Sequence, residues 1–526
     1  MSGREVEVDV SAEQERGYPV GVEQARSPHD TGVYRPRTYL FLDDLHVGRL
    51  DGLRRVTGTV EHATAGPVLA PEAPWEGLGL IGRNCILWDA DESRFKCWYP
   101  AYDPTLPDAP VGAKRRWAYA ESRDGLSWDR PSLGLTEFAG STANNLLRLE
   151  GVGESAAVLW SVAKDPTDPD AARRYKAIGL DRHPLRPGEL TWTGPEGEDE
   201  WYRTHGRHLA CGVYVAYSAD GLTWRQRPGW AGSGALITDN TILHGWDPET
   251  RRWVLWQRPR IMPKHRVIGV SFSADFDDWT FPECVLAPDE DDPPGTQFDQ
   301  LATVAASDGA FVGLLGASAA LRKDRGVMSV VPQLVYSRDA RRWVRVDREP
   351  FIRPRQPLAW DDGCIIPFNP QVVGDDVFLF YYGKNAGHIW GEPTTDGTRV
   401  TRSAFGLVKL RRDRWAALAP AGEADGTLST SLIAFARPEL RVNADAGGGA
   451  IAVELADCQS GNAVTGFTLA DCDPIRGDGV DQVVSWGGRS DLSTIVGTAR
   501  RQPRVGRGLL IRVRLRGNAR LYGLAC

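Results

Sequence analysis

The sequence predicts an all-β protein, in which a five-bladed β-propeller is followed by a C-terminal β-sandwich. Three observations predict it: a strand–turn–strand signature recurs along the chain, turn-forming residues are abundant, and the pattern changes near residue 420. The 526 residues include 57 glycines, 35 prolines and 19 tryptophans. This composition is typical of many short strands that are joined by tight turns and packed through aromatic rings.

The recurring signature is an alternating apolar strand, then Ser-x-Asp, then a short turn, then a tryptophan at the start of the next strand. The copies read WAYAESRDGLSW, VYVAYSADGLTW, VIGVSFSADFDDW and QLVYSRDARRW, and a weaker fifth copy, AFGLVKLRRDRW, lacks the serine. An aspartate in such a turn can accept hydrogen bonds from backbone N–H groups, so Asp124, Asp220, Asp275 and Asp339 are predicted to be structural. The tryptophans are predicted to cover their hairpins and to pack on a neighbouring sheet: Trp128, Trp224, Trp279, Trp343 and, in the weaker copy, Trp415.

Each interval between these tryptophans can be divided into four short strands. In the third interval the strands read NTILHGWD, RWVLWQRP, VIGVSFS and WTFPECVL. The intervals are longer than the ~40–50 residues of a typical propeller blade, which indicates loop insertions. Five sets of four strands predict a propeller over residues 37–420.

The two ends of the chain differ from this pattern. After residue 420 the signature stops, and alternating strands with glycine-rich turns predict a separate β-sandwich over residues 421–526. Residues 1–36 are polar and are expected to form an N-terminal arm without order.

Charge and composition exclude several classes of function. The net charge of −7 disfavours a nucleic-acid partner, and no apolar run approaches the ~18 residues that a membrane helix needs. The charged N-terminus has no apolar core of a signal peptide, so the cytoplasm is the expected location. Eight cysteines without a CxxC pair indicate neither a zinc site nor a disulfide framework, and no catalytic metal or other cofactor is predicted.

A catalytic site is expected where the first strands of the blades begin, because these strands converge on the propeller axis. Three of them start with an aromatic residue followed by an acid, and blade three places Asp239 at the equivalent position. Clustered carboxylates can divide into a proton donor and a nucleophile or base, as glycoside cleavage requires. Alternatively, the acids cap strand starts or bind a structural Ca²⁺ at the axis. The candidate catalytic residues are Glu76, Asp239, Asp299 and Asp361.

Further residues near these strand starts are candidates for substrate binding. Aromatic rings can stack on sugar faces, and a fixed arginine can bind a hydroxyl or orient a carboxylate. A glycine-rich loop after the second strand of blade five could reach the same pocket. The candidates are Trp75, Arg83, Asn84, Arg258, Trp360, Tyr382 and His388.

Several segments resemble bacterial proteins related to glycoside hydrolase family 32. They are LFLDD, PVLAPEAPWEG and, most specifically, SRDGLSWDRPSLGL with the following GSTANNLL, and the resemblance extends over residues 38–526. It implies a five-bladed propeller with a β-sandwich, and retaining cleavage of fructosides by two aspartates and a glutamate. The family's first aspartate motif is absent, and the nearest approach to its Arg-Asp-Pro motif is Lys164-Asp165-Pro166, so no catalytic role is transferred.

These observations predict a glycoside hydrolase-like enzyme that cleaves a small glycoside, a furanoside being one candidate. Its expected partner is a small-molecule glycoside or an oligosaccharide, with neither nucleic acid nor membrane. Two alternatives stay open: a tailoring enzyme that acts on a sugar-bearing metabolite, and a non-catalytic carbohydrate-binding protein.

Overall fold

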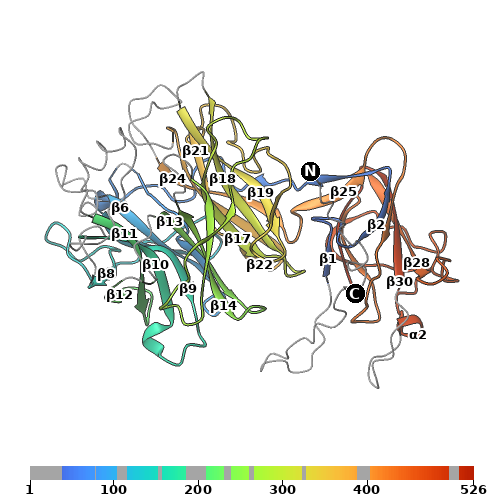
Figure 1. The fold of residues 1–526 in the computed structure, drawn as a ribbon, viewed down its shortest axis with the longest axis horizontal. Coiled ribbons are helices and arrows are strands. Elements are labelled where there is room, and N and C mark those ends of the chain that lie inside the picture. Colours follow the sequence, from blue (N-terminus) through green and yellow to red (C-terminus); the bar gives the residue numbers. More distant parts are fainter. Residues whose placement is uncertain are drawn as a thin grey trace, which may run out of the picture.

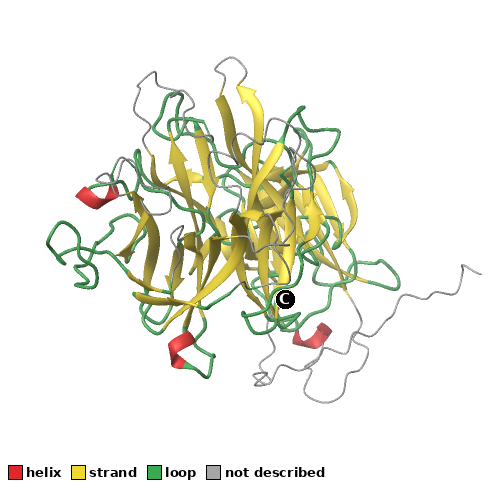
Figure 2. Ribbon diagram, turned by 60° about the vertical axis from the view of Figure 1, so that its left-hand side comes forward, coloured by secondary structure: helices red, strands yellow, loops and turns green. Residues whose placement is uncertain are grey.

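The computed structural model describes residues 38–77, 79–102, 115–151, 157–184, 209–229, 231, 238–259, 266–322, 327–387, 403–496 and 509–526. These residues form two bodies of β-sheet that lie side by side (Figure 1). Within the described ranges, helix is confined to short turns: η2 (Pro74–Glu76), η3 (Ala171–Arg173) and α2 (Ser493–Val496), as Figure 2 shows. The all-β prediction is confirmed.

The larger body contains five sheets, which we call blades one to five. Blade one consists of β5 (Ile86–Asp89), β6 (Arg94–Tyr102) and β7 (Arg115–Ser122). Blade two consists of β9 (Ala157–Lys164), β10 (Tyr175–Pro184), β11 (Leu209–Ser218) and β12 (Thr223–Gln226), with β8 (Arg148–Glu150) at its edge. Blade three consists of β13 (Thr238–Asp247), β14 (Arg252–Pro259), β15 (Ile268–Ser273) and β16 (Glu283–Leu286).

The remaining two blades follow in the same order along the chain. Blade four consists of β17 (Gln297–Ala305), β18 (Phe311–Arg322), β19 (Val327–Ser337) and β20 (Trp343–Arg345). Blade five consists of β21 (Cys364–Pro367), β22 (Gln371–Val373), β23 (Asp376–Lys384), β24 (Ser403–Arg411) and β4 (Glu61–His62).

The first strands of the five blades form a closed ring. Contacts run from β5 to β9, β13, β17 and β21 in turn, and β22 returns to β5. Radial repetition of this kind leaves no long sheet edge exposed, and it confirms the five-bladed propeller. The last blade is completed by the beginning of the chain, because β4 pairs with β24.

Two details of the blades differ from the prediction of four strands each. In blade one, the fourth position is only an isolated bridge between Asp129 and Glu121, because Pro131 soon follows and cannot donate to a ladder. Trp415, which resembles the tryptophans that open fourth strands, leads instead into β25 (Ala416–Pro420) of the second body.

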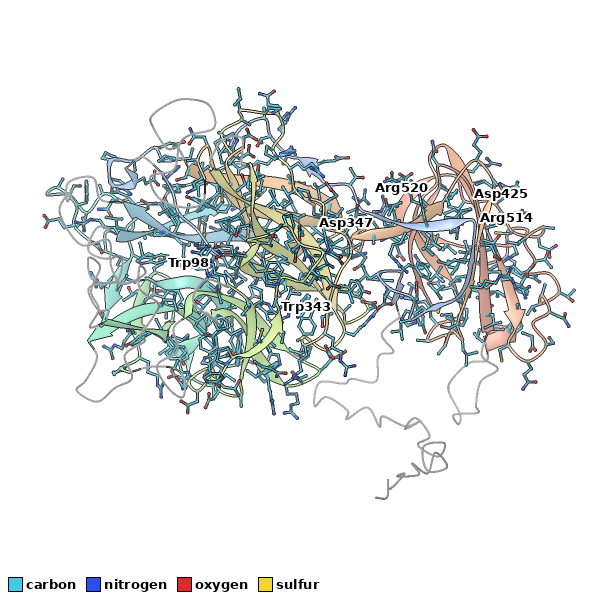
Figure 3. All side chains as sticks on the ribbon, turned by 45° about the horizontal axis from the view of Figure 1, so that its top comes forward. Trp98, Trp343, Asp347, Asp425, Arg514 and Arg520 are labelled. Atoms are coloured by element: carbon cyan, nitrogen blue, oxygen red, sulfur yellow. The ribbon has the colours of Figure 1, made fainter. Side chains whose placement is uncertain are left out.

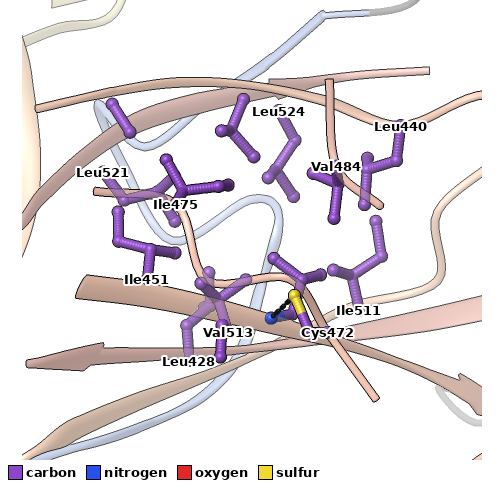
Figure 4. Close-up of a cluster of buried hydrophobic side chains, with 14 of the residues drawn as sticks. Leu428, Leu440, Ile451, Cys472, Ile475, Val484, Ile511, Val513, Leu521 and Leu524 are labelled. Carbon is purple, nitrogen blue, oxygen red and sulfur yellow. Dashed lines mark hydrogen bonds between the residues drawn. The ribbon is translucent and has the colours of Figure 1, made fainter. Parts of the chain in front are cut away.

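The second body is a β-sandwich of two sheets. One sheet has the order β29 (Asp478–Val483), β27 (Arg441–Asp445), β31 (Arg520–Ala525), β25 and β3 (Leu53–Thr57), with β1 (Thr38–Leu40) also on β31. The other has the order β2 (Val47–Asp51), β26 (Gly426–Thr430), β30 (Leu509–Gly517) and β28 (Gly449–Asp457). Alternate residues of β30 are buried, and Ile511 and Val513 meet Leu521 and Leu524 in the core (Figure 4).

The strand pairing corrects the predicted domain boundaries at residues 37 and 421. The strands β1, β2 and β3 come from the N-terminal side of the propeller, yet they pair with C-terminal strands, as the blue and red strands of Figure 1 show. β25, which lies before the predicted boundary, also belongs to the sandwich. Short alternating strands do not indicate which distant strand they will join, so the sequence pattern could not reveal this exchange.

The Ser-x-Asp turns have the structure that the sequence predicts. In the first turn the carboxylate of Asp124 accepts hydrogen bonds from the backbone N–H groups of Leu126 (2.8 Å) and Ser127 (2.9 Å) and from the hydroxyl of Ser122 (3.0 Å). The indole of Trp128 donates to the carbonyl of Gly125 at 3.2 Å. The turns at Asp220, Asp275 and Asp339 repeat these bonds.

Tryptophans also join neighbouring blades, as predicted. Trp343 of blade four contacts Trp256 of blade three edge to face, with ring centroids 5.3 Å apart. Trp98 of blade one is fully buried and donates to the carbonyl of Gly221 in the turn of blade two. Figure 3 shows Trp98 and Trp343 within the larger body. The indole of Trp98 therefore links blade one to blade two.

We expect the first turn to contribute to the pH dependence of stability. The backbone N–H of Ser127, with that of Leu126, lowers the pKa of Asp124 below its usual value. The unfolded chain therefore binds the proton more tightly, so this contribution is present above the unfolded pKa of about 3.9 and is lost as the pH falls through the folded pKa. Asp124→Ala should lower the free energy of unfolding by about 1 kcal/mol at neutral pH. It should also make that free energy fall less steeply between neutral and acidic pH.

Urea unfolding between pH 2 and pH 7 tests this expectation. Glu423→Gln, in an exposed loop of the sandwich, is the control and should follow the wild-type curve. An Asp124→Ala variant that loses stability equally at every pH would contradict the role of the ionised carboxylate.

Candidate active site at the propeller axis

Polar side chains connect the first strands of all five blades. The side-chain oxygen of Asn84, just before β5, accepts the backbone N–H of Asn369, after β21, at 2.8 Å. The amide group of Asn369 donates to the carbonyl of Leu243 in β13 at 2.6 Å, and its oxygen accepts the N–H of Thr303 in β17 at 2.9 Å. The hydroxyl of Ser161 in β9 accepts the N–H of Leu243 at 3.1 Å. This network fixes the axis as one rigid unit.

Beside this network lies an ionic group that we call the axial cluster, formed by Arg83, Arg258 and Asp299. Asp299 in β17 is fully buried. One carboxylate oxygen accepts the guanidinium of Arg83, from blade one, at 2.5 Å, and the other accepts that of Arg258, from β14. Three blades thus supply one buried arrangement of two cations and one anion.

A β-bulge places Asp299 in this position. The register of β17 against β18 shifts between Phe298 and Gln300, so Asp299 is the extra residue. A bulge turns a side chain away from the regular alternation of a strand and is frequent next to active sites. The neighbouring strand β13 has a similar shift between Thr238 and Thr241, at Asp239 and Asn240.

The two bulged strands are held together by side-chain amides. Asn240 donates to the backbone carbonyl of Asp299 at 2.9 Å, and Gln300 accepts Arg83 at 3.2 Å. Gln300 also donates to the carbonyl of Pro367 in blade five. Asp239 therefore lies on β13 next to the residue that touches Asp299; its side chain is outside the described part of the structure.

Within the axial cluster, Arg83 is the member that a ligand can reach. Its side chain is 15% exposed, whereas those of Arg258 and Asp299 are 4% and 0% exposed. A partly open guanidinium that is held by a buried carboxylate is a pre-organised donor for hydroxyl or anionic groups.

Glu76 is not part of the axial cluster, although the sequence suggested it as a catalytic residue. One carboxylate oxygen accepts Tyr99 at 2.5 Å and Arg130 at 2.9 Å, and the other accepts the backbone N–H groups of Glu72 and Ala73. Glu76 is the last residue of η2 and bonds back to that turn's start. The carboxylate of Glu76 therefore has a structural role: it joins η2 to blade one.

Asp361 bonds to a residue outside the axial cluster. It accepts the hydroxyl of Tyr381 at 2.8 Å, and Trp360 stacks on the ring of Tyr381 at 6.0 Å. Tyr381 and Trp360 belong to a core shared with Val312 of blade four. Burial raises the pKa of Asp361, although the bond from Tyr381 opposes this effect. Of the four predicted carboxylates, Asp299 is the one that is bound to Arg83 and Arg258, whereas Glu76 and Asp361 bond to other residues, and a ring of all four around the axis stays a prediction.

The predicted substrate-binding residues divide in the same way. Arg83, Asn84 and Arg258 meet at the axis as described. Trp75 instead donates to the side chain of Asn145 at 2.8 Å, and Trp360 and Tyr382 are parts of hydrophobic cores. His388 lies outside the described residues.

Three polar residues of the axis were not predicted from the sequence: Asn240, Gln300 and Asn369. Asn240 and Gln300 directly follow predicted acids, and regular strand alternation would point them away from the axis. The bulges interrupt this alternation and allow Asn240 and Gln300 to bond at the axis. The sequence feature that could have identified them is the polar residue that directly follows each acid.

The described residues do not favour a cation at the axis. Asp299 already faces two guanidinium groups, a surrounding that repels Ca²⁺. Throughout the described ranges, no three His, Cys, Asp or Glu side chains gather as a set of metal ligands. No helix there is long and apolar enough to cross a bilayer.

Comparisons with known proteins find solved structures of low similarity. No family model matches the sequence, and no curated protein matches it. A glycosyl hydrolase structure from Bacteroides ovatus is 14% identical, with a TM-score of 0.42, over 67% of this chain and 94% of that one. A structure from the GH130 family, described as containing hydrolases of β-1,2-mannosidic linkages in Candida mannan, has the same identity and coverage and a TM-score of 0.43.

A third similar structure has a different activity. It is an N-acetylgalactosamine deacetylase from F. plautii, 12% identical over 69% of this chain and 97% of that one, with a TM-score of 0.40. The relation to family 32 stays a prediction.

Proposed function

We propose that the chain is a carbohydrate-active enzyme of the glycosidase type, which acts on a small glycoside at the axial cluster. The observation that carries the proposal is the carboxylate of Asp299, buried on a bulge and fixed between Arg83 and Arg258 where the first strands of the blades begin. Furanosides are the first substrates to test because of the resemblance to family 32.

The axial residues suit the two tasks of glycoside cleavage. The reaction needs a carboxylic acid that protonates the leaving oxygen and a carboxylate that meets the positive charge developing on the sugar. Two guanidinium groups favour the ionised form of Asp299, which suits the second task once a bound sugar displaces the partly exposed Arg83 from the buried carboxylate. Asp239, on the adjacent bulged strand, is our candidate for the proton donor, and Arg83 for the residue that orients the substrate.

We expect Asp299→Asn and Asp239→Asn to lower kcat/KM at least ~100-fold, the usual effect of removing a group that transfers a proton or stabilises charge. The measurement is hydrolysis of a panel of aryl furanosides, aryl pyranosides and sucrose-type fructosides. Asp361→Asn is the matched control, because Asp361 is a buried aspartate outside the axial cluster, and it should keep nearly wild-type turnover.

The thermal midpoint of each variant separates lost chemistry from lost folding. Wild-type turnover in both axial variants, or an equal loss in Asp361→Asn, would contradict the proposal. Saturable sugar binding by the wild type without turnover of any glycoside would instead indicate a carbohydrate-binding protein. Transfer of the sugar to an acceptor other than water would indicate a tailoring enzyme.

A further inference from the structure

A cavity lies at the end of the blades opposite the axial cluster, and we call it the rear cleft. It has a volume of about 420 Å³ and lies between the turn that follows β9 and the ends of β13 and β15. The first strands begin at the axial cluster, so the residues that end them are at the other face of the propeller. The rear cleft is lined chiefly by Lys164, Asp165, Asp168, Lys176, Trp246 and Trp253.

An exposed tryptophan forms the apolar wall of the rear cleft. Trp246 is 44% exposed, although tryptophan is usually well buried in this protein. It pairs directly with Trp253 across β13 and β14, and the two rings meet edge to face at 5.7 Å. Trp253 is itself buried in the core between blades two and three. The exposed ring is thus supported by a fixed one and loses little entropy when a ligand covers it.

Charged groups form the polar wall of the rear cleft, and they neutralise one another. The ammonium group of Lys176 is buried, donates to Asp168 and lies 3.4 Å from Asp165. Lys164 donates to Asp89 at 2.6 Å and to Asp91 at 2.8 Å. These ion pairs hold the side chains in place and leave no large excess of one charge.

Short turns also fix the outer rim of the rear cleft. Asp165 accepts the backbone N–H and the hydroxyl of Thr167, at 3.1 and 2.7 Å. Asp275 accepts two backbone N–H groups of its hairpin turn. Carboxylate oxygens accept more than one hydrogen bond each, so these groups can still receive hydrogen bonds from a ligand.

We infer that the rear cleft binds a neutral saccharide. The C–H face of a sugar ring packs on an exposed indole, while its hydroxyls bond to fixed carboxylates and ammonium groups. A charged ligand is disfavoured, because the charges of the wall are already paired and would have to be separated. The volume is within the range of small-molecule sites and suits a mono- or disaccharide. This site is independent of the proposed activity at the axis.

Isothermal titration of the full chain with sucrose, kestose, mannobiose, cellobiose and maltose tests this inference. Binding of at least one of them should become ~10-fold weaker or disappear in Trp246→Ala, the loss expected when an aromatic anchor is removed. Phe281→Ala is the matched control: Phe281 is an aromatic residue of blade three that is 64% exposed and lies outside the rear cleft. It should leave the affinity unchanged.

Hydrogen exchange locates the bound sugar independently. Saturation should slow exchange in residues 164–176 and 246–253 of the wild type, and this protection should vanish in Trp246→Ala. Unchanged affinity in Trp246→Ala, absence of that protection, or no binding of any of these sugars would overturn the inference. If Arg83→Ala alone abolishes binding, the rear cleft is refuted while the axial proposal stands.

Discussion

Asp299→Ala should lower the free energy of unfolding by about 3–5 kcal/mol, the usual cost of removing one partner of a buried ion pair. The substitution leaves Arg258, which is almost fully buried, and Arg83 without the carboxylate that they share. A buried cation that has lost its anion pays for its desolvation without compensation. Urea unfolding at neutral pH measures the loss.

A double-mutant cycle separates this ionic effect from a cavity effect. Replacing the cation as well, in Asp299→Ala/Arg258→Met, should recover at least ~1 kcal/mol relative to the sum of the single variants. The exposed pair Arg49–Asp51 provides the control, with side chains 74% and 55% exposed. Asp51→Ala should cost less than about 1 kcal/mol, as is usual for a surface pair. Strictly additive losses at the axis would show that the two side chains are not coupled.

A fragment of residues 421–526 should remain unfolded in isolation. Its two sheets would lack β1, β2, β3 and β25, so β31 and β26 would lose neighbours and much of the core would be exposed. Burial of apolar surface is the main driving force of folding. A chain of this length buries so little apolar surface that losing part of the core prevents folding. Circular dichroism and the dispersion of amide NMR signals would report the absence of a fixed fold.

A permuted fragment should fold where the simple one does not. Thr38 lies opposite Ala525 in the antiparallel pair of β1 and β31, so a short glycine-containing turn can join the two ends. We therefore expect residues 416–526, followed by such a turn and residues 38–57, to unfold cooperatively in urea. A well-folded 421–526 fragment, or an unfolded permuted fragment, would show that the N-terminal strands contribute little.

The sequence was sufficient to predict those parts of the fold that depend on local chemistry. Ser122, Asp124 and Trp128 form a turn whose bonds are made within seven residues, so the repeat could be recognised and the blades counted. The pairing of β4 with β24, and of β1 with β31, depends on strands far apart in the sequence. Alternating short strands carry no label for such partners.

The same distinction explains the partial prediction of the site. Four acids follow comparable positions in the sequence, yet Glu76 bonds to its own turn and Asp361 to Tyr381. Only the bulge in β17 directs Asp299 to the axis, and only long-range folding brings Arg83 and Arg258 to it. Residue type therefore identified candidate residues, but the direction in which each side chain points could not be predicted from the sequence.

The pairing of β1 with β31 also has a consequence for synthesis on the ribosome. The strand that leaves the exit tunnel first among those described needs a neighbour that is translated after all the others. Likewise, β4 is translated early but cannot pair in blade five until β24 has been translated. On the nascent chain, β1 and β4 therefore remain without these strand partners for most of elongation, until β31 and β24 have been synthesised.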